Sequence, residues 1–228
     1  DNNTAVGDQA LQGNTTGTAN VAVGMTALFQ NTTASNNIGI GQQAGYSNTT
    51  GTRIIAIGTN AYDDSDTEND NIAIGYNAMT TNTAGGNTNI AVGNYTLDAL
   101  TSGDDNVAVG HSALGANTTG SYSTAIGKSA LEAATTGVNN TAVGFDAASA
   151  LTTGDSNVAL GDRSMGAVVT GDYNTGLGYA TLYELTSGGN NLAVGRDAGR
   201  ANSPSGSITT NSNRICLGDN NITNAHIK

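Results

Sequence analysis

The sequence predicts an all-β repeat protein, a parallel β-solenoid or β-roll built from coils of 17 residues. Three observations predict it: a glycine that recurs at a nearly fixed period, a short aliphatic word before each of these glycines, and an aromatic content of only 4%. A fixed period below about 20 residues, held over twelve copies, indicates that each repeat is one coil stacked on its neighbours. A chain with so few aromatic residues has to stabilise itself by this repetition, because it lacks the large side chains of an ordinary core.

The period is set by one glycine in each repeat, which we call the anchor glycine. Successive anchors are 17 residues apart, except for one step of 18 and a last step of 23. At about 4.8 Å per stacked strand, twelve coils give a rod on the order of 60 Å long, in which each coil satisfies the backbone groups of the next. The anchors are Gly7, Gly24, Gly41, Gly58, Gly75, Gly93, Gly110, Gly127, Gly144, Gly161, Gly178 and Gly195, with a degenerate last copy at Gly218.

A three-residue strand is predicted directly before each anchor glycine, as at residues 107–109. The two outer residues are aliphatic or Thr, and the central residue is Ala in ten of the first twelve coils and Gly in the other two. Because side chains alternate along a strand, the bulky residues share one face and the small residue occupies the other. Both faces are apolar, so we expect both to be covered. One covering is the opposite wall of a very thin roll, and the other candidate is a second chain.

The remainder of the coil carries three further recurrent positions. The third residue after the anchor is Ala in nine of twelve coils, often followed by Leu or Met, and we expect these residues to form the second wall. The word Thr-Thr-Gly places a glycine ten residues after most anchors, where the sequence predicts a corner with positive φ. An Asn four residues before most anchors, such as Asn106, predicts a ladder of stacked amides at the other corner.

Departures from the period divide the chain. The step of 18 falls at Gly85-Gly86 and is interpreted as a glycine bulge. The step of 23 contains Ser203-Pro204-Ser205-Gly206, so we expect a twelve-coil repeat region at 1–200 and a terminal irregular coil with a transition segment at 201–228. Asp1 already stands inside the first repeat, which indicates a fragment of a longer protein. The single cysteine, Cys216, excludes an internal disulfide framework and is interpreted as a small apolar residue of the last strand.

One coil replaces Thr-Thr-Gly by an acidic segment at residues 62–70. If this segment were extended, Asp64, Asp66, Glu68 and Asp70 would lie on one side, which leaves two interpretations: a solvated turn or a Ca²⁺ loop. A Ca²⁺ loop needs a sharp turn at a glycine, and none occurs between Gly58 and Gly75. The solvated turn is therefore favoured, and we expect no metal and no cofactor.

Charge and hydropathy exclude several classes of function. The net charge is -11 and the seven Lys and Arg residues are scattered, so nucleic-acid binding is not expected. No apolar run approaches the roughly 20 residues of a membrane-spanning helix, and the N-terminus does not have the pattern of a signal peptide. Carboxylates such as Glu132 with Asp146, or Asp162 with its neighbours, are what any acidic surface supplies, so we expect no enzyme.

Repeats of the form Asn-x-Ala-Val/Ile-Gly-x-x-Ala resemble those in the YadA-like heads of trimeric autotransporter adhesins, whose period is shorter. The longer coil with Thr-Thr-Gly, as in Asn140-Thr141-Ala142-Val143-Gly144 followed by Thr152-Thr153-Gly154, is similar to the shafts of phage tail fibres. In those fibres a segment like 215–223 commonly precedes an intramolecular chaperone of the endosialidase type. The resemblance implies a left-handed roll and a homotrimer, either intertwined or side by side, located outside the cell on a virion tail fibre or a cell surface.

The favoured function is that of a non-enzymatic structural or adhesive fibre segment, a rigid trimeric shaft or head that attaches to a host or receptor. Its partners would be further copies of itself and a cell-surface glycan or protein receptor. An ice-binding solenoid and a polysaccharide-processing tailspike remain as alternatives; the first is disfavoured because only one Thr per coil can face outward. The candidate surface contacts are Tyr46, Tyr76, Tyr179, Tyr183, His111 and Phe145.

Overall fold

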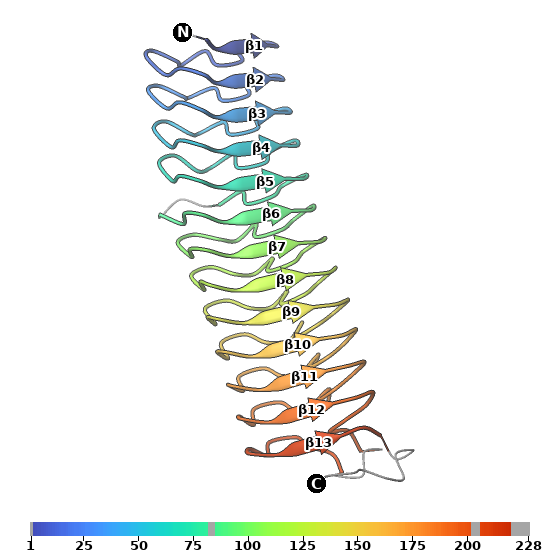
Figure 1. Cartoon of the computed structure of the whole chain (residues 1–228). Helices are drawn as coiled ribbons and strands as arrows, with labels where there is room; N and C mark the ends of the chain where they lie inside the picture. Colours follow the sequence, from blue (N-terminus) through green and yellow to red (C-terminus); the bar gives the residue numbers. More distant parts are fainter. Residues whose placement is uncertain (1, 82–84, 202–205, 220–228) are drawn as a thin grey trace.

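A computed structural model describes residues 2–81, 85–201 and 206–219 and shows one parallel sheet wound as a β-solenoid (Figure 1). Each strand pairs with the next one along the chain, so the order in the sheet is the order in the sequence. This confirms the predicted parallel roll with coils of about 17 residues. The strands are β1 (Thr4–Val6), β2 (Val21–Val23), β3 (Ile38–Ile40), β4 (Ile55–Ile57), β5 (Ile72–Ile74), β6 (Ile90–Val92), β7 (Val107–Val109), β8 (Thr124–Ile126), β9 (Thr141–Val143), β10 (Val158–Leu160), β11 (Thr175–Leu177), β12 (Leu192–Val194) and β13 (Ile215–Leu217).

The register is constant along the sheet, including the two places where the repeat is longer. Ala108 pairs with Ala125 one coil further on, as the period requires. Ile72 still pairs with Ile90 across the step of 18, and Leu192 with Ile215 across the step of 23. Both insertions are thus absorbed outside the strands. At the first one, Gly85 has a φ of 105°; residues 82–84 of the predicted bulge and 203–205 of the second insertion lie outside the described residues.

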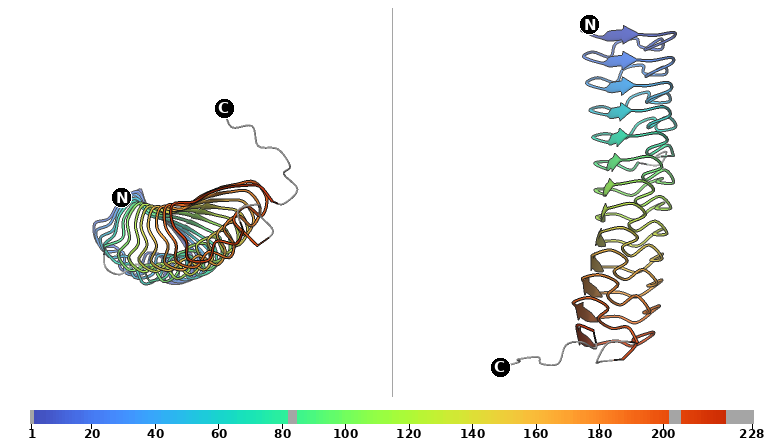
Figure 2. Two further views of the ribbon diagram at one scale, coloured as in Figure 1. Left: turned by 90° about the horizontal axis from the view of Figure 1, so that it is seen from below. Right: turned by 90° about the vertical axis from the view of Figure 1, so that its right-hand side faces the viewer.

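The interior of the roll is one layer of small and medium side chains between the sheet and a wall of turns. Ala108, at the centre of β7, is fully buried, as are Ala113 and Leu114 in the opposite wall. The two walls touch: a Cβ added to Gly39 in β3 would lie 2.8 Å from Cγ of Leu28. Seen along the axis, the coils are correspondingly flat (Figure 2). The small face of the strand therefore packs against the opposite wall of a very thin roll, as one of the two predicted coverings required.

Anchor glycines are needed for both conformation and space. Gly110 has a φ of 135°, and a Cβ on it would lie 2.5 Å from the carbonyl oxygen of Gly127 in the next coil. The predicted positive φ at the Thr-Thr-Gly corner is wrong, since glycines such as Gly120 do not have it. Gly120 is required for close stacking instead: its added Cβ would lie 2.4 Å from the carbonyl oxygen of Gly137.

The wall opposite the sheet is built from consecutive tight turns. In the coil of β7, Ala113 N–H donates to Gly110 C=O at 3.3 Å and Gly115 N–H donates to Ser112 C=O at 3.2 Å. The third residue of each turn, Ser112 and then Leu114, has a φ of 55° and 51°. Positive φ at the third residue is the pattern of a type II turn, in which glycine is the usual choice. The sequence does not reveal these turns, because Leu and Ser carry the conformation in place of glycine.

The predicted amide ladder is present and is buried. The side chain of Asn106 accepts the backbone N–H of Ser123 at 3.0 Å and donates to the carbonyl of Gly120 at 2.9 Å. Its own backbone N–H is bound in turn by Oδ1 of Asn89. Each buried amide thus ties its own coil to the corner and to both neighbouring coils.

Candidate functional site

The outward face of the sheet is formed by the first and third residues of β1–β13, and we call it the strand face. In β7 these are Val107 and Val109, both half-buried, on either side of the buried Ala108. Aliphatic side chains or Thr occupy the face in every strand, so it is apolar over the full length of the sheet. Its most exposed aliphatic residues are Val6, Ile40, Ile126, Leu160, Leu192, Val194, Ile215 and Leu217.

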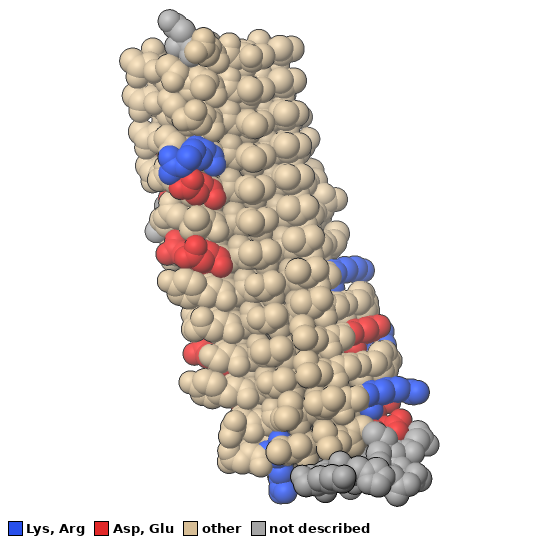
Figure 3. All heavy atoms as spheres, in the orientation of Figure 1, with Lys and Arg blue, Asp and Glu red and all other residues tan. Residues whose placement is uncertain are grey.

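Charged side chains lie along the margins of the strand face rather than on it. Figure 3 shows an uncharged strip over the strands with acidic and basic groups to either side. Asp105 stands two residues before β7, and His111 stands two residues after it. Thirteen strands of three residues make a strip on the order of 60 Å long and 10 Å wide. A contiguous apolar patch of this size marks an interaction surface.

A second surface lies where the chain leaves the strands, and we call it the turn edge: the first, second and fifth residues after each anchor glycine. All six sequence-predicted contacts belong to it. The structure brings two of them, Tyr76 and His111, to either side of Tyr95. The ring centroids of Tyr76 and Tyr95 are 5.4 Å apart, and those of Tyr95 and His111 are 5.7 Å apart, both in edge-to-face contact. Such pairs stabilise a fixed arrangement of the rings.

Phe145 occupies a cationic part of the turn edge. The Lys128 ammonium and the Arg163 guanidinium lie 5.8 Å and 5.7 Å from the centre of its ring. A hydrogen bond with Tyr179, together with the charge of Asp162, raises the pKa of Arg163 above its usual value. Phe145 is therefore held between two cations and is only partly available to a ligand.

Tyr183 is fixed on both of its faces. The Arg200 guanidinium lies 5.3 Å from its ring centre, and a Cβ on Gly166 would meet Cε2 of the ring at 2.9 Å. Asp197 binds Arg200 at 2.6 Å. The remaining predicted contact, Tyr46, is half-buried and stacks on Phe29 with centroids 5.1 Å apart. Tyr183 and Tyr46 thus serve packing between coils as well as the surface.

Beside the Tyr76–Tyr95–His111 cluster the turn edge is hollowed. A groove of about 490 Å³ is lined by Tyr95, Asp98, Ala99, Ser112, Gly115, Ala116 and Glu132. The groove exists because Gly115 has no side chain, whereas the equivalent positions one coil away on either side carry the carboxylates of Asp98 and Glu132. Burial raises the pKa of the Asp98 carboxyl, while its hydrogen bonds with backbone N–H groups of Asp98 and Ala99 oppose that shift.

Sequence reasoning missed Tyr95, Asp98 and Gly115. Tyr95 follows its anchor glycine by two residues, and the sequence alone does not show that this position faces the surface with a positive φ of 56°. The signal was nevertheless in the period: aligning the fifth residue after each anchor puts Gly115 between two acids at steps of 17.

The acidic segment does not place its carboxylates on one side. Glu68 is only 2% exposed and turns inward, where its carboxylate accepts the backbone N–H groups of Asp66, Thr67 and Gly85. Asp70 pairs with Arg53 at 2.5 Å, and Asp64 and Asp66 are exposed. Within the described residues, no three His, Cys, Asp or Glu side chains form a group that could hold a metal ion.

Threonines of the Thr-Thr-Gly corner point in two directions, as strand-like alternation requires. The first hydroxyl of each pair is used between coils: Thr118 donates to the carbonyl of Thr135 at 3.0 Å. The second, at Thr119, is exposed. A single column of Thr and Ser side chains therefore faces solvent at this corner.

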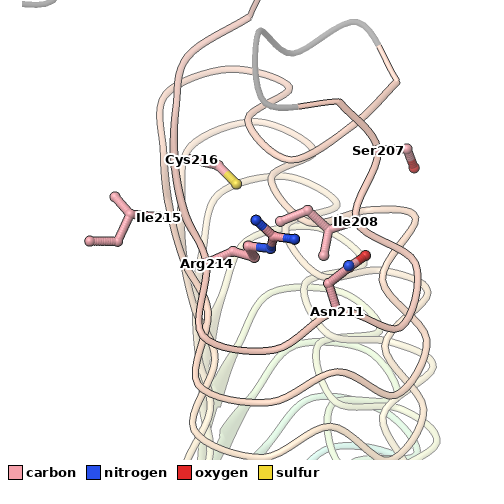
Figure 4. A pocket seen from close by; sticks show the side chains of 6 residues that line it. All are labelled: Ser207, Ile208, Asn211, Arg214, Ile215 and Cys216. Atoms are coloured by element: carbon pink, nitrogen blue, oxygen red, sulfur yellow. The ribbon is translucent and has the colours of Figure 1, made fainter.

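The last coil ends in a cavity of about 250 Å³ lined by Ser207, Ile208, Asn211, Arg214, Ile215 and Cys216. Figure 4 shows Cys216 directed into the roll and Ile215 directed away from it. Cys216 is 1% exposed, which confirms its interpretation as a small buried residue of the last strand. No helix in the described part of the chain is long and apolar enough to cross a membrane.

The comparisons with known proteins give no relative from which a function could be transferred. No family model matches the chain, and neither the curated proteins nor the solved structures contain a match. The functional argument therefore rests on the surfaces themselves.

Proposed function

We propose that this chain is a non-enzymatic structural and adhesive fibre segment: a rigid shaft in which three parallel copies pack through their strand faces. The observation that carries the proposal is the uncharged, apolar strand face, which runs unbroken over thirteen strands. The resemblance of the repeats to adhesin heads and tail-fibre shafts supports three copies and a location on a virion or cell surface.

Energetics favour covering this face. Each aliphatic side chain that passes from half-exposed to buried gains about 25 cal/mol per Å² of apolar surface removed from water. Two such residues per strand, repeated over the whole sheet, give an interface whose contribution grows with the length of the rod. Single coils would contribute little, but the constant register lets all of them engage together.

The margins are compatible with parallel copies in register. In a closed ring of parallel chains, the margin before the strands of one copy meets the margin after the strands of the next. At the level of β7 this pairs Asp105 with His111, and at β8 it pairs Tyr122 with Lys128. From β1 to β13, no level places two charges of the same sign together. Like-charge repulsion would otherwise oppose the assembly.

Sedimentation equilibrium tests the proposal. We expect a species of three times 22.7 kDa, about 68 kDa. Replacing Val109 and Val143 together by Lys puts two charges on the strand face and should reduce the mass toward that of one chain, because buried unpaired charge is costly. Thr119→Lys, which adds a charge at the exposed corner, is the control and should leave the mass unchanged. A monodisperse 22.7 kDa species for the unaltered chain would refute the proposal.

A further inference from the structure

We propose that the groove at Gly115 is a binding site for a neutral saccharide, with Tyr95 as the stacking wall and the carboxylates of Asp98 and Glu132 as hydroxyl acceptors. The inference deepens the adhesive part of the proposed function by giving that adhesion a site and a ligand class.

The gap at Gly115 is not demanded by the fold. Gly115 does not have positive φ, and a Cβ there would lie 3.3 Å from the Ser112 carbonyl oxygen, 3.5 Å from that of Tyr95 and 3.7 Å from Oδ1 of Asp98. The same position holds Phe29, Tyr46 and Glu132 in other coils. The missing side chain thus leaves a groove that packing does not explain. Its volume of about 490 Å³ lies within the range of small-molecule sites, about 300–1,000 Å³.

The walls offer the two kinds of contact that a sugar ring needs. A pyranose has a C–H face, which packs on an aromatic ring, and a rim of hydroxyl groups, which donate and accept hydrogen bonds. Tyr95 is 38% exposed at the groove and is held by edge contacts to Tyr76 and His111. A ring fixed in this way loses little conformational entropy on binding. Ser112 adds a hydroxyl whose Oγ lies 2.9 Å from Nδ1 of His111.

The charge of the groove selects a neutral ligand. Both ionisable groups that line it, Asp98 and Glu132, are acids, and no Lys or Arg is among its lining residues. Ionised carboxylates only accept hydrogen bonds, so they suit hydroxyl donors and repel sialylated, sulfated or phosphorylated glycans. Asp98 is also partly desolvated, as its raised pKa shows, so water competes less there for the hydrogen bonds. Along a trimeric shaft the groove would occur three times, and repeated glycans would bind with avidity.

An array of immobilised neutral oligosaccharides, with sialylated and sulfated counterparts and with EDTA present, tests the proposal on the full chain. We expect binding to neutral glycans, and NMR titration with the best-bound free oligosaccharide should shift the resonances of Tyr95. Gly115→Gln fills the groove without removing a contact and should abolish binding. Tyr95→Ala should weaken it about tenfold. Ser149→Gln changes the same column outside the groove and should bind as the unaltered chain does.

Absence of binding, binding of acidic glycans only, or binding that survives Gly115→Gln would each overturn the inference. Sedimentation of the same variants separates this outcome from that of the proposed function. A trimer that ignores every glycan refutes the groove alone, and a monomer that binds neutral glycans refutes the shaft alone.

Discussion

Gly110 lies so close to Gly127 that a Cβ on the first residue would stand 2.5 Å from the carbonyl oxygen of the second. The same contact recurs at nearly every anchor, and with it a φ near 130°. The repeat therefore preserves glycine where two coils come closest.

Gly110→Ala should destabilise the roll by at least about 1–3 kcal/mol, since alanine is strained at this φ and the coils would have to separate. Gly115→Ala is the matched control in the same coil, because its added Cβ has no neighbour closer than 3.3 Å. Chemical denaturation measures both variants. Equal stability of the two would show that the anchor contact relaxes without cost.

Ala108→Leu should cost about 1–3 kcal/mol or more, because its side chain is fully buried between the two walls. Val109→Leu, one residue further on, faces outward and places a residue that β10 and β11 carry at the equivalent position in Leu160 and Leu177. We expect it to be nearly neutral. An unchanged melting temperature for Ala108→Leu would mean that the roll is thicker than it appears in the structure.

Asn106→Ala removes an amide that serves two buried backbone groups, the Ser123 N–H and the Gly120 carbonyl. Leaving each of them unpaired costs about 1–3 kcal/mol. Asn106→Ser should be intermediate, because Ser123 fills the same column and its Oγ accepts the backbone N–H of Asn140 at 3.2 Å. Thr119→Ala, at an exposed corner, is the control. The ladder would have no energetic role if all three variants melted together.

The period predicted much of this fold, but it could not predict the turns. Gly, Ala and aliphatic residues at fixed offsets are enough to place every strand, the register and the buried amides. Leu114 shows the limit: its type is that of a core residue, and it is one, yet its backbone takes a φ of 51° that residue type does not reveal. The wall of turns depends on hydrogen bonds between coils, and these exist only once the coils are stacked.

The candidate site was partly predictable for the same reason. Tyr76 and His111 are recognisable as surface residues because their column accepts every kind of side chain. Their contact through Tyr95 requires the curvature of the turns. Glu68 was misplaced because alternation along an extended segment puts it with Asp64, whereas the structure turns it inward to accept backbone N–H groups.

Asp63 should make the stability depend on pH. Burial, and secondarily the charge of Asp64, raises its pKa to about 6, and its Oδ1 has no hydrogen-bond partner among the described residues. Because the folded pKa exceeds the unfolded value of 3.8, the folded state holds the proton more tightly between those two pH values. The contribution of Asp63 is thus most favourable below pH 4, is lost as the pH rises toward 6, and stays at its least favourable above that.

Asp63→Asn removes the ionisation and should therefore stabilise the chain at pH 7.5 and have little effect at pH 4. The carboxyl is about half exposed, so solvent screening limits the gain to about 1 kcal/mol or less. Melting temperatures of the variant and the unaltered chain across this pH range give the difference directly. A difference that does not change with pH would show that Asp63 titrates normally.

The pairing of margins in the proposed trimer predicts a specific cross-link. Ser156 and Asp162 stand two residues before and two residues after β10, at opposite margins of the same level. In register, Ser156 of one copy meets Asp162 of the next, and the relation repeats around the threefold axis. Replacing both by Cys should therefore give covalently closed trimers under mild oxidation. The native Cys216 is buried and should not compete.

Either single Cys variant serves as the control, because the same margin of three copies does not meet itself in such a ring. Non-reducing electrophoresis distinguishes the products. Trimers from the double variant alone support parallel copies in register. Dimers from a single variant would instead indicate a twofold, self-complementary interface, and the shaft would then be a pair of rolls rather than three.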